Sequence, residues 1–396
     1  MNRRGVEIDG VQAYRSIAEI DDRVDAAILL IPAEHCPQAI RELGALGTRA
    51  VVVAVSGFAE LGTDEGRRLQ DEIVDAAYAH GIRLVGPNCN GVYDTRRPLS
   101  LGYNYLHGLK VPPGGVALLS HSGAIGGTAY ELIAPFGASL SHFVSCGNEA
   151  DLQLLDYAEY LVEDPAVEVF ALILDAVEDG PRFRRFARRA RELGKPILAM
   201  KLGNSDLARE ATLAHSSRLS GAKDVYDAVF YDDGVVLVPT LESLMITAGL
   251  ASVGRSTERS GIVVTSPSGG GAISLTDALN RQEVELAPLD EATVEDMRPS
   301  SGFATVMNPF DLGAGTSKNA HLNVPALAAA DGVGAIAFVV TILQTEAGML
   351  RYASAFAETQ ERFPDLATVV AAIAPLRPIE EKVYRGARIP VVRSTS

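Results

Sequence analysis

The chain lacks several features that would each point to a particular class of protein. Its 396 residues include only three cysteines, Cys36, Cys89 and Cys146, and no two of them are close in sequence. This spacing predicts neither a disulfide framework nor a cysteine zinc site, and reduced thiols are typical of the cytoplasm, where we expect the protein. The seven histidines show no HExxH-like spacing, so we expect no metal site built by this chain.

Basic side chains are too few for a nucleic-acid surface. Lys and Arg total 35 against 50 Asp and Glu, which gives a formal net charge of −15. Binding to a phosphate backbone needs a basic surface, so we expect no nucleic-acid partner. No apolar run is long enough to span a bilayer, and the first residues, MNRRGVEIDG, lack the apolar segment of a signal peptide. We therefore expect no membrane partner either.

Two nucleotide-binding motifs are also missing. The sequence contains no GxxxxGK[ST] loop, whose backbone and lysine hold nucleotide phosphates. It also has no GxGxxG turn after a first strand with an acidic residue about 20 positions later, which argues against an NAD-dependent dehydrogenase. Any chemistry with a nucleoside triphosphate is therefore expected to use another chain.

What the sequence does contain is a regular alternation of apolar runs and amphipathic stretches. The runs AVVVAVSG, VFALILDA and GAIAFVVT are continuous and rich in β-branched residues. Such runs predict strands buried on both faces, hence parallel sheets flanked by helices. The stretch RFRRFARRARELG (182–194) is typical of a crossover helix. The sequence therefore predicts a doubly wound α/β fold.

Two polar, turn-rich segments interrupt this alternation. HGLKVPPGG (107–115) and ASVGRSTERSG (251–261) predict boundaries near residues 110 and 256, and thus three units, 1–110, 111–256 and 257–396. The second and third units open alike, with GVALLSHSGAIGGTAYEL and GIVVTSPSGGGAISLTDAL. We interpret this as a diverged duplication of one flavodoxin-like domain. Coincidence is the alternative, because strand–glycine–helix turns recur throughout α/β folds.

The turn SHSGAIGG (120–127) is the first candidate site. A predicted strand leads into it and a predicted helix follows, so Ser122, Gly123 and Ala124 would face an anion at the positive end of the helix. The alternative is a tight turn without a ligand. The similar turn of the third unit offers a weaker second anion site at Ser268, Gly269 and Gly270.

Three further residues stand where chemistry is often found. His215 lies in a loop rich in Gly and Ser, where an imidazole is either a nucleophile or base, or an ordinary loop histidine. Asp175 ends a predicted strand, where a carboxylate is either functional or a helix cap. The turn GPNCNG (86–91) also follows a strand and can line a pocket, and its Cys89 is either a nucleophile or a buried, inert thiol.

Taken in order, these segments resemble the NDP-forming acyl-CoA synthetase superfamily, which includes succinyl-CoA synthetase and ADP-forming acetyl-CoA synthetase. AILLIPAE, VVVAVSGFAELG and VGPNCNG resemble its CoA-binding domain. GVALLSHSGAIGG, FVSCGNEADLQLLDYAEYLVEDP and LAHSSRLSGAKDVYDAVF resemble its flavodoxin-like domain, and GIVVTSPSGGGAISLTDAL and MNPFDL its ligase-type domain. The resemblance implies a Rossmann-like CoA-binding domain followed by two flavodoxin-like domains.

The first of these domains is expected to be incomplete. The family's opening strand and Gly-rich turn, which hold the CoA diphosphate, would precede Met1. A misplaced start codon, a truncated sequence and a genuine loss of CoA binding are the alternatives.

The resemblance also implies a reaction and partners. A carboxylic acid, CoA and a nucleoside triphosphate become acyl-CoA, nucleoside diphosphate and phosphate, reversibly, through an acyl phosphate and a phosphohistidine. The partner would be an ATP-grasp (β-type) subunit that holds ATP or GTP with Mg²⁺. CoA and a small carboxylic acid would be substrates, and the assembly would be an oligomer. The alternative is a non-catalytic regulatory module that binds CoA or acyl-CoA.

The resemblance assigns roles residue by residue. His215 matches the phosphohistidine, and Asp175 stands where the family usually has a glutamate that orients it. The loop AHSSRLSG departs from the usual SHTGALAG, with Ser217 in place of a glycine, and Arg218 either pairs with phosphate or obstructs the loop. The remaining matches are Ser122, Gly123 and Ala124 for phosphate, and Pro32, Ser56, Gly57, Asn88 and Cys89 for CoA or substrate.

Overall fold

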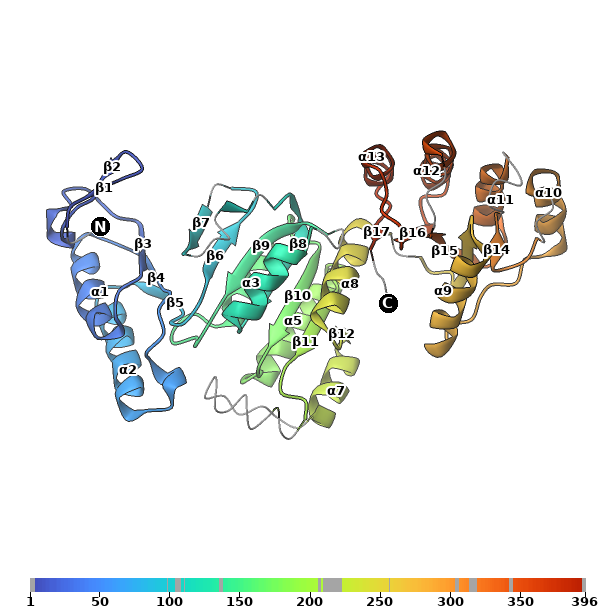
Figure 1. Cartoon of the computed structure of the whole chain (residues 1–396). Coiled ribbons are helices and arrows are strands. Elements are labelled where there is room, and N and C mark those ends of the chain that lie inside the picture. Colours follow the sequence, from blue (N-terminus) through green and yellow to red (C-terminus); the bar gives the residue numbers. More distant parts are fainter. Residues whose placement is uncertain are drawn as a thin grey trace. The chain divides into compact units, whose positions relative to one another are not determined.

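The protein is described by a computed structural model that covers residues 4–97, 99–103, 108–109, 111–134, 138–205, 208, 223–255, 257–302, 306–312, 319–341 and 345–393. The chain divides into two compact units. One comprises Met1–Ala134 with Ser139–Ala248, and the other comprises Pro135–Ala138 with Gly249–Ser396. Parallel strands joined through helices make up most of both units (Figure 1), which confirms the α/β class.

After the antiparallel pair β1-β2, the first unit holds a small parallel sheet in the order β3-β4-β5. Alternate residues of its strands face opposite ways, as the period of a strand requires. Val51 and Val53 pack against the two helices of this sheet, whereas Val52 and Val85 face residues of the next sheet, among them Val92. The elements are β1 (Glu7–Ile8), β2 (Val11–Gln12), η1 (Ile17–Glu19), β3 (Ala26–Leu29), η2 (Ala33–His35), α1 (Cys36–Ala45), β4 (Ala50–Val53), η3 (Ala59–Leu61), α2 (Asp64–Ala79) and β5 (Arg83–Val85).

The second sheet of this unit has the strand order β12-β11-β10-β8-β9-β6-β7. Leu119, Phe170 and Leu172 face a core shared with α4, α5 and α7. On α3, the ring of Tyr130 packs at a tilt against Phe143 of β9, with 5.3 Å between the ring centroids. The elements are β6 (Gly91–Asp94), β7 (Leu99–Gly102), β8 (Pro113–Ser120), α3 (Gly123–Leu132), β9 (Leu140–Ser145), α4 (Leu154–Leu161), β10 (Val169–Leu174), α5 (Gly180–Glu192), β11 (Ile197–Lys201), α7 (Lys223–Asp232), β12 (Val235–Leu237) and α8 (Leu241–Val253).

Strands β6 and β7 belong to this second sheet although they precede residue 110. Tyr93 of β6 pairs antiparallel with Phe143 of β9, and Val92 pairs with Leu101 of β7. The change of sheet therefore falls between β5 and β6, in the turn 86–90. The Pro- and Gly-rich segment 107–115 lies between β7 and β8, two strands of one sheet.

The second unit holds a parallel sheet in the order β14-β13-β15-β16-β17. Ala272 of α9 packs on the face that carries Val264 and Val339. The other face packs against α10 to α13, and Figure 1 shows α12 and α13 on the side of the sheet opposite α9. The elements are β13 (Gly261–Ser266), α9 (Gly269–Arg281), α10 (Glu291–Ser301), β14 (Phe310–Asp311), η5 (Ala320–Asn323), α11 (Val324–Ala329), β15 (Val333–Val340), α12 (Glu346–Arg362), β16 (Ala367–Ala372), α13 (Pro378–Gly386) and β17 (Val391–Val392).

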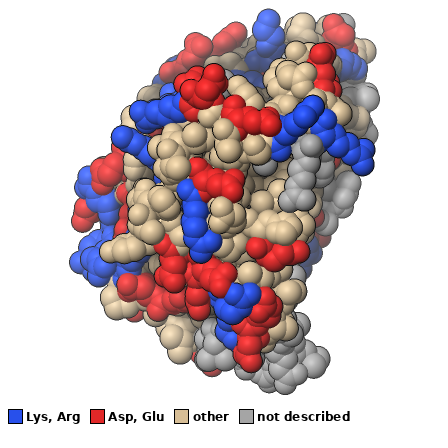
Figure 2. Space-filling model, turned by 90° about the vertical axis from the view of Figure 1, so that its left-hand side faces the viewer, with Lys and Arg blue, Asp and Glu red and all other residues tan. Residues whose placement is uncertain are grey.

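Charged side chains of both signs are intermingled on the face shown in Figure 2. Helix α2 illustrates the pattern, because Arg68 pairs with Glu65 and Glu72 within two turns. Such exposed pairs contribute little to stability. Among the described residues, no helix combines the length and the apolar character that crossing a bilayer would require.

Candidate functional site

The carboxyl ends of β8 and β10 bring two predicted site segments together. The strands are parallel neighbours, with Ser120 opposite Ile173. The turn after β8 and Asp175 after β10 therefore lie at the same edge of the sheet, although they are more than 50 residues apart. Asp175 is only 8% exposed, and its backbone N–H donates to Nδ1 of His121, 3.0 Å away. This is the edge at which open α/β sheets bind their ligands.

Helix α3 starts at this carboxyl end of the sheet. Ser122 is its N-cap, and the Ser122 hydroxyl accepts a hydrogen bond from the backbone of Ile125 at 3.3 Å. The first turn of the helix contains no acidic residue, so no carboxylate of its own neutralises the positive end of the dipole. Gly123 and Ala124 present the first helical N–H groups, which is the arrangement that binds phosphate at helix starts.

The turn GPNCNG reaches the same place from the first sheet. The Asn90 side chain donates to the carbonyl of Gly123 at 2.6 Å, and its backbone N–H donates to the Ser145 hydroxyl at 3.0 Å. The turn that ends β5 is thus fastened to the start of α3. The predicted CoA turn and the predicted phosphate turn are neighbours in the structure.

The predicted CoA residues follow the carboxyl ends of β3, β4 and β5. Pro32 precedes η2, Ser56 and Gly57 follow β4, and Asn88 follows β5 with its N–H donating to the Val55 carbonyl at 3.0 Å. The backbone N–H groups of Gly57 and Phe58 both donate to Glu60 Oε1, at 2.6 and 3.1 Å. The carboxylate of Glu60 therefore already accepts hydrogen bonds from these two backbone N–H groups of the loop after β4.

Cys89 is buried beneath the turn GPNCNG. It is 3% exposed, and its sulfur lies 3.6 Å from the Val53 carbonyl oxygen and 3.7 Å from that of Val85. Burial raises the pKa of the Cys89 thiol to about 12, so the thiolate is almost absent at neutral pH. The structure therefore favours the buried, inert thiol over a nucleophile.

The same reasoning predicts the behaviour of the cysteines in solution. All three are buried, and burial also raises the pKa of Cys36 to about 12. Because a raised pKa removes thiolate at pH 8, the native protein is expected to react with a thiol-specific disulfide reagent at least about 100-fold more slowly than the denatured protein. Rapid titration of even one thiol in the native protein would show that this interior opens.

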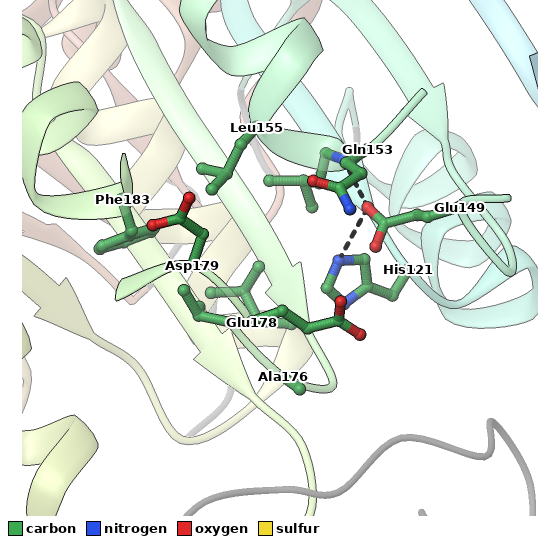
Figure 3. Close-up of a pocket in the computed structure, with 11 residues that line it drawn as sticks. His121, Glu149, Gln153, Leu155, Ala176, Glu178, Asp179 and Phe183 are labelled. Atoms are coloured by element: carbon green, nitrogen blue, oxygen red, sulfur yellow. Dashed lines mark hydrogen bonds and ion pairs between the residues drawn. The ribbon is translucent and has the colours of Figure 1, made fainter. Parts of the chain in front are cut away.

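Two residues that the sequence did not suggest lie in this edge, His121 and Glu149. His121 Nε2 is 3.3 Å from Glu149 Oε1, and the His121 side chain is 4% exposed. Figure 3 shows the imidazole directed at Glu149, beside a hollow that opens next to the end of β10. His121 lies inside the predicted turn SHSGAIGG, between two serines, and this position is the one sequence signal that could have drawn attention to it. The other residues that line the hollow are Gln153, Leu154, Leu155, Leu174, Ala176, Val177, Glu178, Asp179 and Phe183.

Three predicted residues, His215, Ser217 and Arg218, fall outside the described residues. The proximity of His215 to Asp175 that their roles imply therefore stays a prediction. Within the described part of the chain, no group of three or more His, Cys, Asp or Glu side chains is arranged to hold a metal ion.

The second Ser-Gly turn has different surroundings from the first. Ser268 caps α9 and accepts from the Gly271 backbone at 3.4 Å. A Cβ on Gly269 would lie 2.8 Å from Asp311 Oδ2, so a carboxylate borders this helix start. Because that negatively charged carboxylate would repel an anion, this turn is less suited than the start of α3 to bind one.

Comparisons with known proteins identify two family domains in this chain. Residues 1–95 match the CoA binding domain family, and residues 113–251 match the succinyl-CoA ligase like flavodoxin domain family. The chain is 32% identical over 351 residues to the acetate–CoA ligase [ADP-forming] II subunit alpha of Pyrococcus furiosus, covering 88% of this chain and 75% of that one. It is 32% identical to acetate–CoA ligase [ADP-forming] I of Archaeoglobus fulgidus, covering 79% of this chain but only 45% of that protein.

The fold has a solved counterpart. A structure of dinucleotide forming acetyl-coenzyme A synthetase 1 from Ca. Korarchaeum cryptofilum superposes with a TM-score of 0.82 at 24% identity, covering 97% of this chain and 82% of that one. At this identity the superposition establishes the fold, and the sequence matches establish the kinship. The chain belongs to the NDP-forming acyl-CoA synthetase superfamily, a family of acid–thiol ligases.

Proposed function

We propose that this chain is the CoA-binding and phosphoryl-carrying component of an acid–CoA ligase. With its partner it would convert a small carboxylic acid, CoA and a nucleoside triphosphate to acyl-CoA, nucleoside diphosphate and phosphate. The observation that supports this best is the meeting of the α3 start, Asp175 and the turn GPNCNG at one edge. A phosphate site, an orienting carboxylate and a CoA-binding turn are the parts such a reaction needs side by side.

The steps assign a role to each residue. A nitrogen of His215 attacks the terminal phosphorus of the nucleotide, and the N–P bond forms as the O–P bond to the diphosphate breaks. An O–P bond to a carboxylate oxygen of the acid then forms as the N–P bond to His215 breaks. The CoA thiolate forms a C–S bond to the resulting acyl carbon as the C–O bond to phosphate breaks, and phosphate leaves. The start of α3, at Ser122, Gly123 and Ala124, stabilises the phosphoryl charge, and Asp175 orients the imidazole.

The partner supplies what this chain lacks. A matched relative is named as an alpha subunit, which supports a partner chain. We propose an ATP-grasp subunit that holds ATP or GTP with Mg²⁺, because the sequence has no GxxxxGK[ST] loop. We further propose that CoA lies along the ends of β3, β4 and β5, past Pro32 and Ser56, with its thiol near Asn88. Oligomeric assembly and a cytoplasmic location are part of the same proposal.

Asp175 offers a direct test of the orienting role. Asp175→Asn keeps the size of the side chain but removes the charge that would fix the imidazole tautomer. The rate of phosphoryl labelling of this chain from γ-labelled ATP, with partner and Mg²⁺, is expected to fall about 10- to 100-fold. The substitution Asp75→Asn, at an exposed position of α2, serves as the matched control and should label normally. Normal labelling of Asp175→Asn would remove this residue from the site.

The proposed function is separated from its alternative by two measurements on the wild-type protein. An acid–CoA ligase component should acquire an acid-labile, base-stable phosphoryl group and, with CoA and a suitable acid, form acyl-CoA. A regulatory module should bind CoA in calorimetry and never be labelled. Micromolar binding of ATP to this chain alone would contradict the assignment of the nucleotide to the partner.

A further inference from the structure

His121 is held by both nitrogens of its ring. Nδ1 accepts the backbone N–H of Asp175 at 3.0 Å, so Nδ1 carries no proton. In a neutral imidazole the proton is then on Nε2, which faces Glu149 Oε1 at 3.3 Å. The hydrogen-bond network thus specifies a single tautomer of a side chain that is 4% exposed.

Glu149 is itself fixed from several sides. Its backbone has φ = 57°, the left-handed region that non-glycine residues rarely occupy. Its carboxylate also accepts the backbone N–H of Leu154, at the start of α4. Such a conformation persists where the surroundings determine it, and here it aims the carboxylate at His121.

The segment around Glu149 is braced against the first sheet. Asp151 forms an ion pair with Arg83 at 2.9 Å and accepts the backbone N–H of Leu84 at 2.8 Å. The Asn148 side chain donates to Gln70 at 3.0 Å and also to Glu60. The segment that carries Glu149 is therefore held by hydrogen bonds and an ion pair to residues of β5 and α2. His121 links this segment to the residue that follows β10, Asp175.

We propose that His121 is a positioning residue that sets the backbone of Asp175 and, through it, the rate of phosphoryl transfer. The inference rests on the proposed function. His121 is not a second phosphoryl acceptor, because Nδ1 and Nε2 are both engaged and the side chain is buried. Its effect comes from the acceptor Nδ1, which meets an amide that would otherwise be buried without a partner.

The test uses two replacements of equal size. In His121→Asn the side-chain oxygen takes the place of Nδ1 and can accept the Asp175 N–H, whereas His121→Leu has the same branching without an acceptor. With partner, Mg²⁺ and γ-labelled ATP, we expect His121→Asn to label within about threefold of wild type, and His121→Leu about tenfold or more slowly. The apparent KM for ATP and the affinity for CoA should be unchanged in both.

Thermal unfolding of both variants separates positioning from support of the fold. Equal labelling rates for Asn and Leu, or rates that follow the unfolding midpoint, would overturn the inference. Wild-type labelling by His121→Leu would overturn it too. If the wild-type protein itself never labels, the proposed function fails first, so the two failures are distinguishable.

Discussion

His215→Ala is expected to abolish phosphoryl labelling of this chain, with a rate at least about 10³-fold below wild type, because removing a covalent nucleophile leaves no atom to accept the group. The assay contains the ATP-grasp partner, Mg²⁺ and γ-labelled ATP, and the label is read after denaturation. A phosphoramidate is lost in acid and survives base, which distinguishes it from phosphoserine and from an acyl phosphate.

The matched control for this prediction is His80→Gln. His80 is exposed at the end of α2, far along the chain from the loop at 215. It should label as the wild type does. If His215→Ala labels normally, the phosphohistidine lies elsewhere whatever the fold. Arg218→Ala distinguishes two roles of this arginine. The labelling rate of the variant should fall if Arg218 pairs with phosphate and rise if Arg218 obstructs the loop.

Gly147→Ala is expected to destabilise the protein strongly, because the close neighbours of this glycine belong to the turn GPNCNG. Gly147 has φ = 60°, and a Cβ there would lie 2.1 Å from the Pro87 carbonyl oxygen and 2.4 Å from that of Asn88. Both contacts are with backbone, which cannot rotate away. We expect a loss of about 3 kcal/mol or more in the free energy of unfolding, together with weaker CoA binding, because the turn GPNCNG must move.

Gly194→Ala separates the two causes of that loss. Gly194 also has a left-handed backbone, with φ = 67°, but nothing lies within 4 Å of the position that a Cβ would take there. It should cost only about 1–2 kcal/mol, from backbone strain alone. Chemical denaturation measures both variants, and calorimetry measures CoA binding. Equal losses would mean that the close approach of Gly147 to the turn is unimportant.

The sequence predicted the strands well because burial on both faces leaves a local trace. VFALILDA became β10 and GVALLSHSG became β8, since continuous apolar runs are what a central parallel strand requires. The sheet membership of β6 was not predictable in the same way. Its partner β9 lies some 50 residues later, and antiparallel pairing with it leaves no mark in the local composition.

The same distinction applies to the candidate site. Asp175 and Ser122 were suggested by position, because the ends of parallel strands share one edge. His121 and Glu149 were not, because their contact joins a turn after β8 to a loop after β9. The orientation of Glu149 also depends on its left-handed backbone conformation, which the sequence does not predict for a glutamate. Tertiary hydrogen bonds of this kind become visible only in the folded chain.

Strands β6 and β7 precede residue 113 but belong to the second sheet, and this determines where the chain can be cut into separate fragments. A fragment that begins at residue 113, where the flavodoxin family match starts, would lack the strand that covers β9. The hydrogen-bonding groups of β9 would then form an open edge, which invites pairing with a second copy. Excision in the turn 86–90, before Gly91, would keep the edge of β9 covered, so this turn is the better place to separate the two sheets.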